Sequence, residues 1–117
     1  MRSTQEVIDH HLECFARGDT DGILADYSPT AVMLTPTGAL KGPAAIRPVF
    51  QTIFTEFAQP GTSFSMQHRS VDGDYAYLLW TAETADNVYE LGTDTFVVRD
   101  DQIVAHSFAL KSVAKRR

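Results

Sequence analysis

The sequence predicts an α+β domain in which helices pack on one face of a curved antiparallel sheet. Apolar residues follow helical spacing in the first half of the 117-residue chain and strand spacing in the second half. Short turn sequences rich in Asp, Asn and Gly divide the second half into strands. The length suits one domain with a single core, and we assign residues 1–117 to it.

Two helices are predicted at the start of the chain. Ser3 and Glu6 have the spacing of a capping box, and Gly18 suits the left-handed position that ends a helix. A short second helix follows, and we expect it to run through Tyr27 until Pro29 ends it.

A short strand and a third helix are predicted next. The apolar run Ala31 to Thr35 lies between two prolines and predicts a strand, while Gly38 and Gly42 indicate turns. Pro43 suits the first position of a helix with a broad apolar face. Pro48 removes a backbone donor one turn later, so we expect a kink or a later start there.

Four strands are predicted in the second half, over residues 62–71, 74–85, 88–99 and 102–113. The turns between them are short, so consecutive strands are expected to pair as an antiparallel meander.

Composition and charge exclude several classes of protein. The net charge of −5 argues against a nucleic-acid-binding domain, which needs a basic surface. The single cysteine, Cys14, excludes an internal disulfide, and no local metal-ligand spacing occurs, so we expect no metal and no other cofactor. No apolar run has the length of a membrane span or signal peptide. We therefore expect a cytoplasmic protein without membrane contact.

Three short motifs in the sequence resemble those of a known protein superfamily. They are Gly18-Asp19 after the first helix, GPAAIR from Gly42 at the start of the third, and DTFVVRDDQI from Asp94 in the meander. With the order of elements, they resemble the nuclear transport factor 2-like superfamily in its SnoaL-like and ketosteroid-isomerase-like branches. The resemblance covers nearly the whole chain. It implies a cone, in which a strongly curved antiparallel sheet wraps three N-terminal helices around an apolar pocket, and a homodimer through the outer sheet face.

Asp94 is the first candidate catalytic residue. It alternates with Phe96 and Val98, so its carboxyl group is expected to face the pocket; the alternative is a solvated or dimer-interface position. In the resembled isomerases, an aspartate at this place is kept protonated by an apolar site and donates to a developing oxyanion. His106 is the second candidate, as a general base or as a partner of Asp94 across neighbouring strands. The alternative for His106 is a core histidine bonded to a backbone carbonyl.

Further residues are expected to bind the substrate. His11 lies on the apolar stripe of the first helix, at the place of the isomerases' oxyanion-binding tyrosine, and Tyr27 is expected to point to the same pocket. His68 is a polar candidate whose strand face the pattern does not determine. The expected apolar lining consists of Phe50, Phe54, Phe57, Phe96 and Phe108.

The chain departs from the isomerase pattern at the catalytic base. The isomerases have an aspartate before a proline on the first strand, where this chain has Thr35 before Pro36. Threonine does not take up a proton near neutral pH. Phe50 also stands where the isomerases have a tyrosine in the third helix. These differences argue against steroid isomerisation by that mechanism.

Two functional hypotheses remain open. In the first, the protein is a cofactor-free isomerase, cyclase or dehydratase that moves protons on a small apolar carbonyl compound, with Asp94 and His106 as the acid/base pair. In the second, which Thr35 favours, the pocket belongs to a non-catalytic homodimeric module that binds a small apolar molecule or a partner protein. A purely structural dimerisation unit is a third possibility, and its cavity would be filled by phenylalanines.

Overall fold

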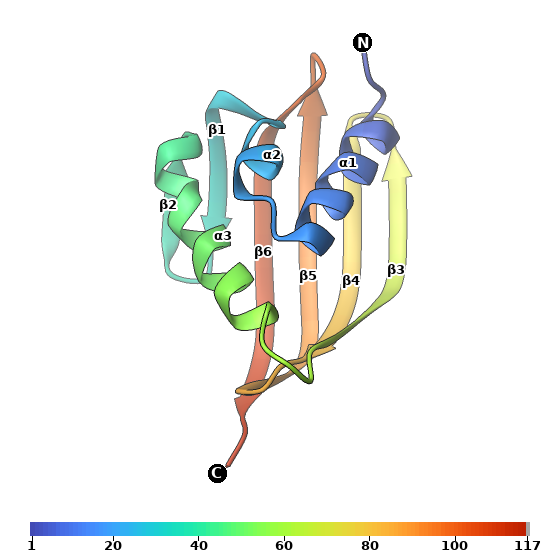
Figure 1. Ribbon diagram of the computed structural model, residues 1–117. Helices are drawn as coiled ribbons and strands as arrows, with labels where there is room; N and C mark the ends of the chain where they lie inside the picture. The colour runs from blue at the N-terminus through green and yellow to red at the C-terminus, as the bar shows by residue number, and fades with distance from the viewer. Residues whose placement is uncertain (117) are drawn as a thin grey trace.

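The structure is a computed structural model, and it describes residues 1–116. The helices are α1 (Thr4–Arg17), α2 (Thr20–Leu24) and α3 (Pro43–Phe57). The strands are β1 (Tyr27–Thr35), β2 (Gly38–Lys41), β3 (Ser63–Asp72), β4 (Tyr75–Glu83), β5 (Asn87–Arg99) and β6 (Gln102–Ala114). All three helices lie across one face of a single sheet with the order β2-β1-β6-β5-β4-β3 (Figure 1). The predicted α+β fold class is confirmed.

The ends of α1 follow the predicted local signals. The Glu6 backbone N–H donates to Ser3 Oγ at 3.1 Å, and the Ser3 N–H donates to Glu6 Oε1 at 2.9 Å. Gly18 has φ 64° and ends the helix in the left-handed conformation. Because both ends are set locally, the limits of α1 could be predicted from the sequence.

The second helix is shorter than predicted. It ends at Leu24, and Tyr27 starts β1 instead of closing the helix. Pro29 therefore lies inside a strand. The pairing of β1 with β6 is interrupted between Tyr27 and Val32, so the missing N–H of Pro29 removes no bond from the ladder.

The sheet is mixed, whereas we predicted an antiparallel one. β1 and β6 pair in parallel, with Met33 opposite His106, while every other neighbouring pair is antiparallel. The predicted meander of four strands is present as β3 to β6. The sequence prediction missed β2, which forms a hairpin with β1 and starts at the expected turn residue Gly38.

The third helix starts at Pro43, so the predicted later start is wrong, and Pro48 lies inside the helix. The main core lies between the helices and the inner face of the sheet, and its fully buried residues include Ile8, Ile46, Phe96 and Ile103.

None of the helices in residues 1–116 has the length and hydropathy needed to cross a membrane.

Candidate functional site

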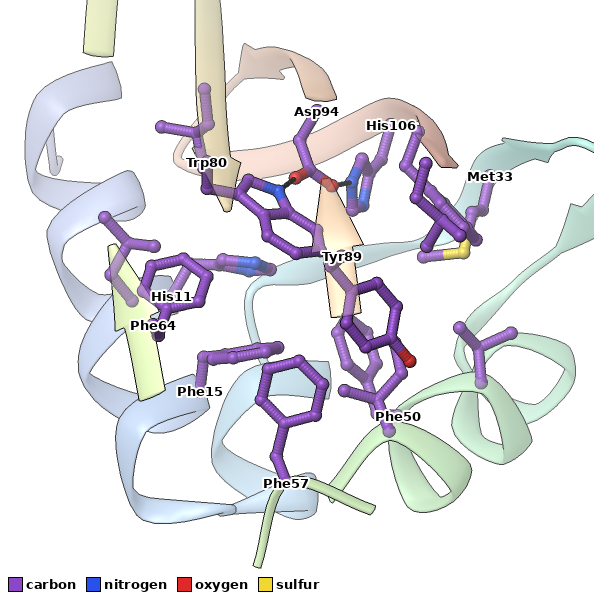
Figure 2. Close-up of a pocket in the computed structure, with 16 residues that line it drawn as sticks. His11, Phe15, Met33, Phe50, Phe57, Phe64, Trp80, Tyr89, Asp94 and His106 are labelled. Carbon is purple, nitrogen blue, oxygen red and sulfur yellow. Dashed lines mark hydrogen bonds and ion pairs between the residues drawn. The ribbon is translucent and has the colours of Figure 1, made fainter. Parts of the chain in front are cut away.

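A cavity of about 80 Å³ lies between α1 and α3 and the inner face of the sheet (Figure 2). Its polar lining residues are His11, Tyr89, Asp94 and His106. Most of the wall is aromatic, formed by Phe15, Phe50, Phe57, Phe64, Trp80, Tyr89 and Phe108. Aliphatic side chains complete it: Leu12, Met33, Val49, Ile53, Leu78 and Leu110. No lysine or arginine is among these residues, so the cavity is apolar except at a few points.

A shallower groove of about 320 Å³ adjoins the cavity. The two share Val49, Phe108 and Leu110, and the β1–β2 hairpin forms the other side of the groove. Thr35 lines this groove and not the cavity, and its hydroxyl donates to the Gly38 carbonyl at 2.9 Å. The position of the missing isomerase base is therefore outside the cavity.

Asp94 lies on the inner face of β5 and points into the cavity wall (Figure 2). Its Oδ2 accepts the indole N–H of Trp80 at 2.7 Å, and its Oδ1 lies 2.7 Å from His106 Nε2. Burial raises the pKa of Asp94, but the hydrogen bonds to His106 and Trp80 outweigh burial and leave the pKa below its ordinary 3.8. Asp94 is thus an ionised carboxylate, and not the protonated acid that the resemblance implied. The predicted hydrogen bond between Asp94 and His106 is confirmed.

Trp80 reaches Asp94 because its neighbour on β5 has no side chain. Trp80 pairs with Gly92, and a β-carbon on Gly92 would overlap the indole ring. The ring therefore lies over Gly92 and turns its N–H toward Asp94, two residues farther along the same face.

His106 is 4% exposed and both of its ring nitrogens have partners. Nε2 contacts Asp94, and Nδ1 lies 2.7 Å from the hydroxyl of Tyr27. Phe96 stacks on the ring at a centroid distance of 4.1 Å. Tyr27, His106, Asp94 and Trp80 thus form a continuous chain of hydrogen bonds at one wall of the cavity.

His11 is buried on α1 and lines the same cavity (Figure 2). Its ring contacts the edges of Phe50, Phe96 and His106 at centroid distances of 6.0, 5.0 and 6.0 Å. Its Nδ1 is enclosed and lacks a hydrogen-bond partner within residues 1–116. Burial lowers the pKa of His11 from 6.5 to about 3, so the imidazole is neutral at physiological pH. His11 thus presents a neutral imidazole ring at the cavity wall.

Tyr89 lines the cavity because β5 contains a bulge. Tyr89 pairs with Ser112 and Leu91 with Lys111, so Glu90 is an extra residue on β5. The bulge reverses the alternation and turns the Tyr89 ring inward. The Tyr89 hydroxyl donates to the carboxylate of Glu56 on α3 at 2.8 Å. Burial and this hydrogen bond raise the pKa of Tyr89, which therefore stays protonated.

Six of the ten predicted site residues line the cavity: His11, Phe50, Phe57, Asp94, His106 and Phe108. They come from α1, α3, β5 and β6, so the tertiary structure brings together residues that are far apart in the sequence.

The other four predicted residues do not line it. Tyr27 lies behind His106, and Phe96 is fully buried beneath the His106 ring. Phe54 packs in the core against Phe15 and Phe50, at centroid distances of 5.5 and 5.8 Å. His68 is exposed and bonds Ser70 on its own strand, outside the cavity. The periodicity of a helix or strand predicts which face a residue lies on, but it does not distinguish a cavity wall from the packed core beside it.

The sequence prediction missed Trp80 and Tyr89. The face of Trp80 depends on the β4–β5 register, and the face of Tyr89 depends on the bulge at Glu90. Gly92 inside a strand of large residues was the available signal for Trp80, since glycine in a strand often marks close approach by another group.

Within residues 1–116, no three His, Cys, Asp or Glu side chains are grouped so that they could hold a metal ion.

Known protein structures share this fold. A nuclear transport factor 2-like protein of unknown function from Mesorhizobium loti is 25% identical, with a TM-score of 0.77 over 92% of this chain and 90% of that chain. A candidate polyketide cyclase from Sinorhizobium meliloti is 17% identical, with a TM-score of 0.72 over 88% and 93% of the two chains. AclR, a candidate hydroxylase from Streptomyces galilaeus, is 13% identical, with a TM-score of 0.74 over 92% and 88%.

No curated protein is significantly similar to the sequence. The profile of the SnoaL-like domain family matches residues 8–106, which is most of the chain. The chain therefore belongs to the SnoaL-like domain family.

Proposed function

We propose that the protein is a cofactor-free enzyme that abstracts a proton next to a carbonyl group, as in an isomerisation, cyclisation or dehydration. The observation that carries this proposal is the Asp94 carboxylate, which lies in an apolar cavity wall and is held by Trp80 and His106. A carboxylate oriented by two donors keeps lone pairs for a third partner, and a preorganised base needs no rearrangement when the substrate arrives.

Asp94 acts as the general base in this proposal. It takes the proton from carbon, and the electrons of the broken C–H bond form an enolate whose charge collects on the carbonyl oxygen. Because its pKa is lowered, Asp94 is a weak base. Its substrates therefore need a strongly activated C–H bond, such as one between two carbonyl groups.

His11 hydrogen-bonds the carbonyl oxygen in the same step. It is neutral, it lines the same cavity from α1, and its ring lies next to His106 at a centroid distance of 6.0 Å. A neutral imidazole N–H directed at a carbonyl oxygen stabilises the charge that develops there. His106 orients Asp94 in this scheme, because both of its nitrogens already have partners.

The apolar walls determine the kind of substrate. The cavity accepts a ring-sized apolar group, and the adjoining groove of about 320 Å³ can hold a larger portion of the same molecule. A likeness to a candidate polyketide cyclase supports a cyclic or cyclising carbonyl substrate.

Hydrogen–deuterium exchange tests the proposal without knowledge of the product. A panel of cyclic β-dicarbonyl compounds is incubated in D2O with the protein, and NMR follows loss of the C–H signal. We expect accelerated exchange by the wild type and by Glu83→Gln, a carboxylate variant that lies outside the cavity and pairs with Lys115. Asp94→Asn is expected to lose the acceleration. Equal exchange by Asp94→Asn and the wild type contradicts the proposal.

A binding module without catalysis is the second candidate function. The absence of a base at Thr35 and the commitment of both Asp94 oxygens to hydrogen bonds favour it. Compounds of the same panel that bind tightly but show no exchange above the uncatalysed rate would support the binding module.

We also propose a homodimer through the outer face of the sheet. Tyr75, Tyr77, Leu91 and Val113 are large apolar residues that are between 37% and 56% exposed, more than an isolated sheet face usually presents. Sedimentation of the wild type and of Leu91→Glu tests this. A monomeric wild type contradicts the dimer.

A further inference from the structure

Asp94 is a carboxylate whose neighbours in the cavity supply no positive charge. The lining residues include no lysine or arginine, and the indole of Trp80 is a neutral donor. Only His106 could supply a countercharge directly, so its protonation state decides the charge of the site.

The contact with the Tyr27 hydroxyl favours a neutral His106. The Tyr27 side chain is 3% exposed, and its hydroxyl has one hydrogen-bond partner within residues 1–116, His106 Nδ1 at 2.7 Å. A buried hydroxyl left without an acceptor costs about 1–3 kcal/mol, so the Tyr27 O–H donates and Nδ1 accepts. The His106 proton is then on Nε2, where it is donated to Asp94 Oδ1. The imidazole carries no charge, and the pair carries one negative charge.

The other titratable groups nearby do not balance this charge. His11, which faces the same cavity from α1, is neutral because burial lowers its pKa to about 3. Glu56 adds a second carboxylate near the cavity through its hydrogen bond with Tyr89, and its three donors are the neutral groups of Thr84, Asn87 and Tyr89. Among the residues that line the cavity and Glu56, every formal charge is therefore negative.

Displacement of water from the cavity makes this imbalance important. An apolar ligand that fills the cavity displaces water from the Asp94 carboxylate without offering it a hydrogen bond or a positive charge. This desolvation is unfavourable. A cationic group compensates the carboxylate, and the aromatic walls attract the same cation through their π faces. Trp80 donates to Asp94, and Phe64 and Tyr89 contact the Trp80 ring at centroid distances of 5.4 and 5.9 Å, so aromatic rings line the cavity next to the carboxylate.

We propose that the ligand of this cavity is a compact organic cation, a protonated amine joined to an apolar group of about one ring. The proposal concerns binding at the site of the proposed function, and it refines the substrate class to carbonyl compounds that carry a protonated amine. A positive nitrogen near the reacting carbon also makes its C–H bond more acidic, as the weak base Asp94 requires.

Three probes of similar shape and different charge test the proposal at pH 7: benzylammonium, benzyl alcohol and benzoate. The chain has one tryptophan, so the Trp80 indole N–H gives a single NMR signal from the group bonded to Asp94. We expect benzylammonium to bind about tenfold or more tightly than benzyl alcohol, and benzoate not to bind. Equal or tighter binding of the alcohol, binding of benzoate, or no response to benzylammonium overturns the proposal.

Asp94→Asn provides the matched variant, with Glu83→Gln as the control for a carboxylate outside the cavity. Asp94→Asn is expected to bind the cation and the alcohol equally, and Glu83→Gln to keep the wild-type preference. A tenfold preference that survives in Asp94→Asn overturns the assignment to Asp94. If this variant does not fold, the three wild-type titrations still decide. The titrations measure binding and not catalysis. If the protein prefers the cation but does not catalyse exchange, the proposed function is contradicted and the proposal about the ligand stands.

Discussion

The protein contains two aspartates, one buried and one largely enclosed at the cavity wall, that are satisfied in different ways. Asp26, between α2 and β1, is 1% exposed, and its two oxygens lie 2.8 Å from Arg2 Nη1 and 2.6 Å from His10 Nδ1. Asp94 has only neutral donors, Trp80 and His106, and it lines a cavity.

The comparison separates a structural carboxylate from one that is available for chemistry. The charge of Asp26 is compensated within the chain, because Arg2 joins it to Asp101 in the β5–β6 turn and so ties the N-terminus to the sheet. The charge of Asp94 is left for whatever enters the cavity. A buried carboxylate without a protein cation is costly for stability, and such costs are typical of functional sites.

The largest expected effect is on catalysis at Asp94. Asp94→Asn is expected to slow deuterium exchange by about 10²- to 10⁴-fold, because the general base is lost. The amide keeps one acceptor oxygen, so the unfolding free energy is expected to change by less than about 1 kcal/mol. Exchange kinetics and urea unfolding measure the two quantities. An exchange rate of Asp94→Asn within threefold of the wild-type rate would contradict the assignment of Asp94 as the general base.

The reverse pattern is expected at Asp26. Asp26→Asn is expected to lower the unfolding free energy by about 2 kcal/mol, because it weakens a buried ion pair with partly exposed Arg2. Exchange at the cavity should continue in the folded variant. The control is Asp101→Asn, which removes the other, more exposed partner of Arg2 and is expected to cost less than about 1 kcal/mol. Equal costs in urea unfolding would contradict the structural role of Asp26.

Two adjacent histidines on α1 extend the comparison to pH. His10 pairs with Asp26, whereas His11 is buried at the cavity, where burial lowers its pKa from 6.5 to about 3. Between these pH values the unfolded chain binds a proton at His11 that the folded protein does not bind, so stability falls as the pH is lowered. From pH 6.5 to pH 5 this group is expected to remove about 1.5 kcal/mol.

The variant His11→Phe isolates that contribution, since other groups titrate in both proteins. Its unfolding free energy is expected to fall by about 1.5 kcal/mol less than that of the wild type over the same pH range. Urea unfolding at the two pH values provides the measurement. An identical decline in both proteins would show that His11 takes up its proton in the folded state.

The smallest expected effect is at Glu56, a third carboxylate, which like Asp94 has neutral donors. Glu56 is half-buried, and its carboxylate accepts hydrogen bonds from Thr84, Asn87 and Tyr89. Tyr89→Phe removes one donor and is expected to lower the unfolding free energy by about 1 kcal/mol. Thermal unfolding of this variant, with Tyr77→Phe on the outer face as the control, measures the difference. Equal melting temperatures for the two variants would contradict a contribution from the Glu56 contact.

Local signals predicted much of the fold. The Ser3–Glu6 capping box and Gly18 predicted the limits of α1, and alternation predicted that Asp94 shares the inner face of β5 with Phe96. The prediction that Pro29 ends the second helix placed Tyr27 in that helix, which is wrong. The structure instead places Pro29 where the β1 ladder is interrupted, and there a proline is tolerated.

The candidate site was predictable only in part, because its decisive contacts join different strands. The β4–β5 register and the open space over Gly92 place the Trp80 indole beside Asp94. The bulge at Glu90 turns Tyr89 inward against the simple alternation of the strand.

The sequence by itself determined that the chain has three helices, where α1 begins and ends, the four-strand meander, and that a carboxylate lies among phenylalanines on an inner face. These features depend on neighbours along the chain, so local periodicity and capping signals predict them. Only the tertiary structure decided that Asp94 has neutral donors and Asp26 has Arg2. The reason is physical: the charge balance of a buried group depends on side chains brought to it by strand register and packing, and sequence spacing does not specify them.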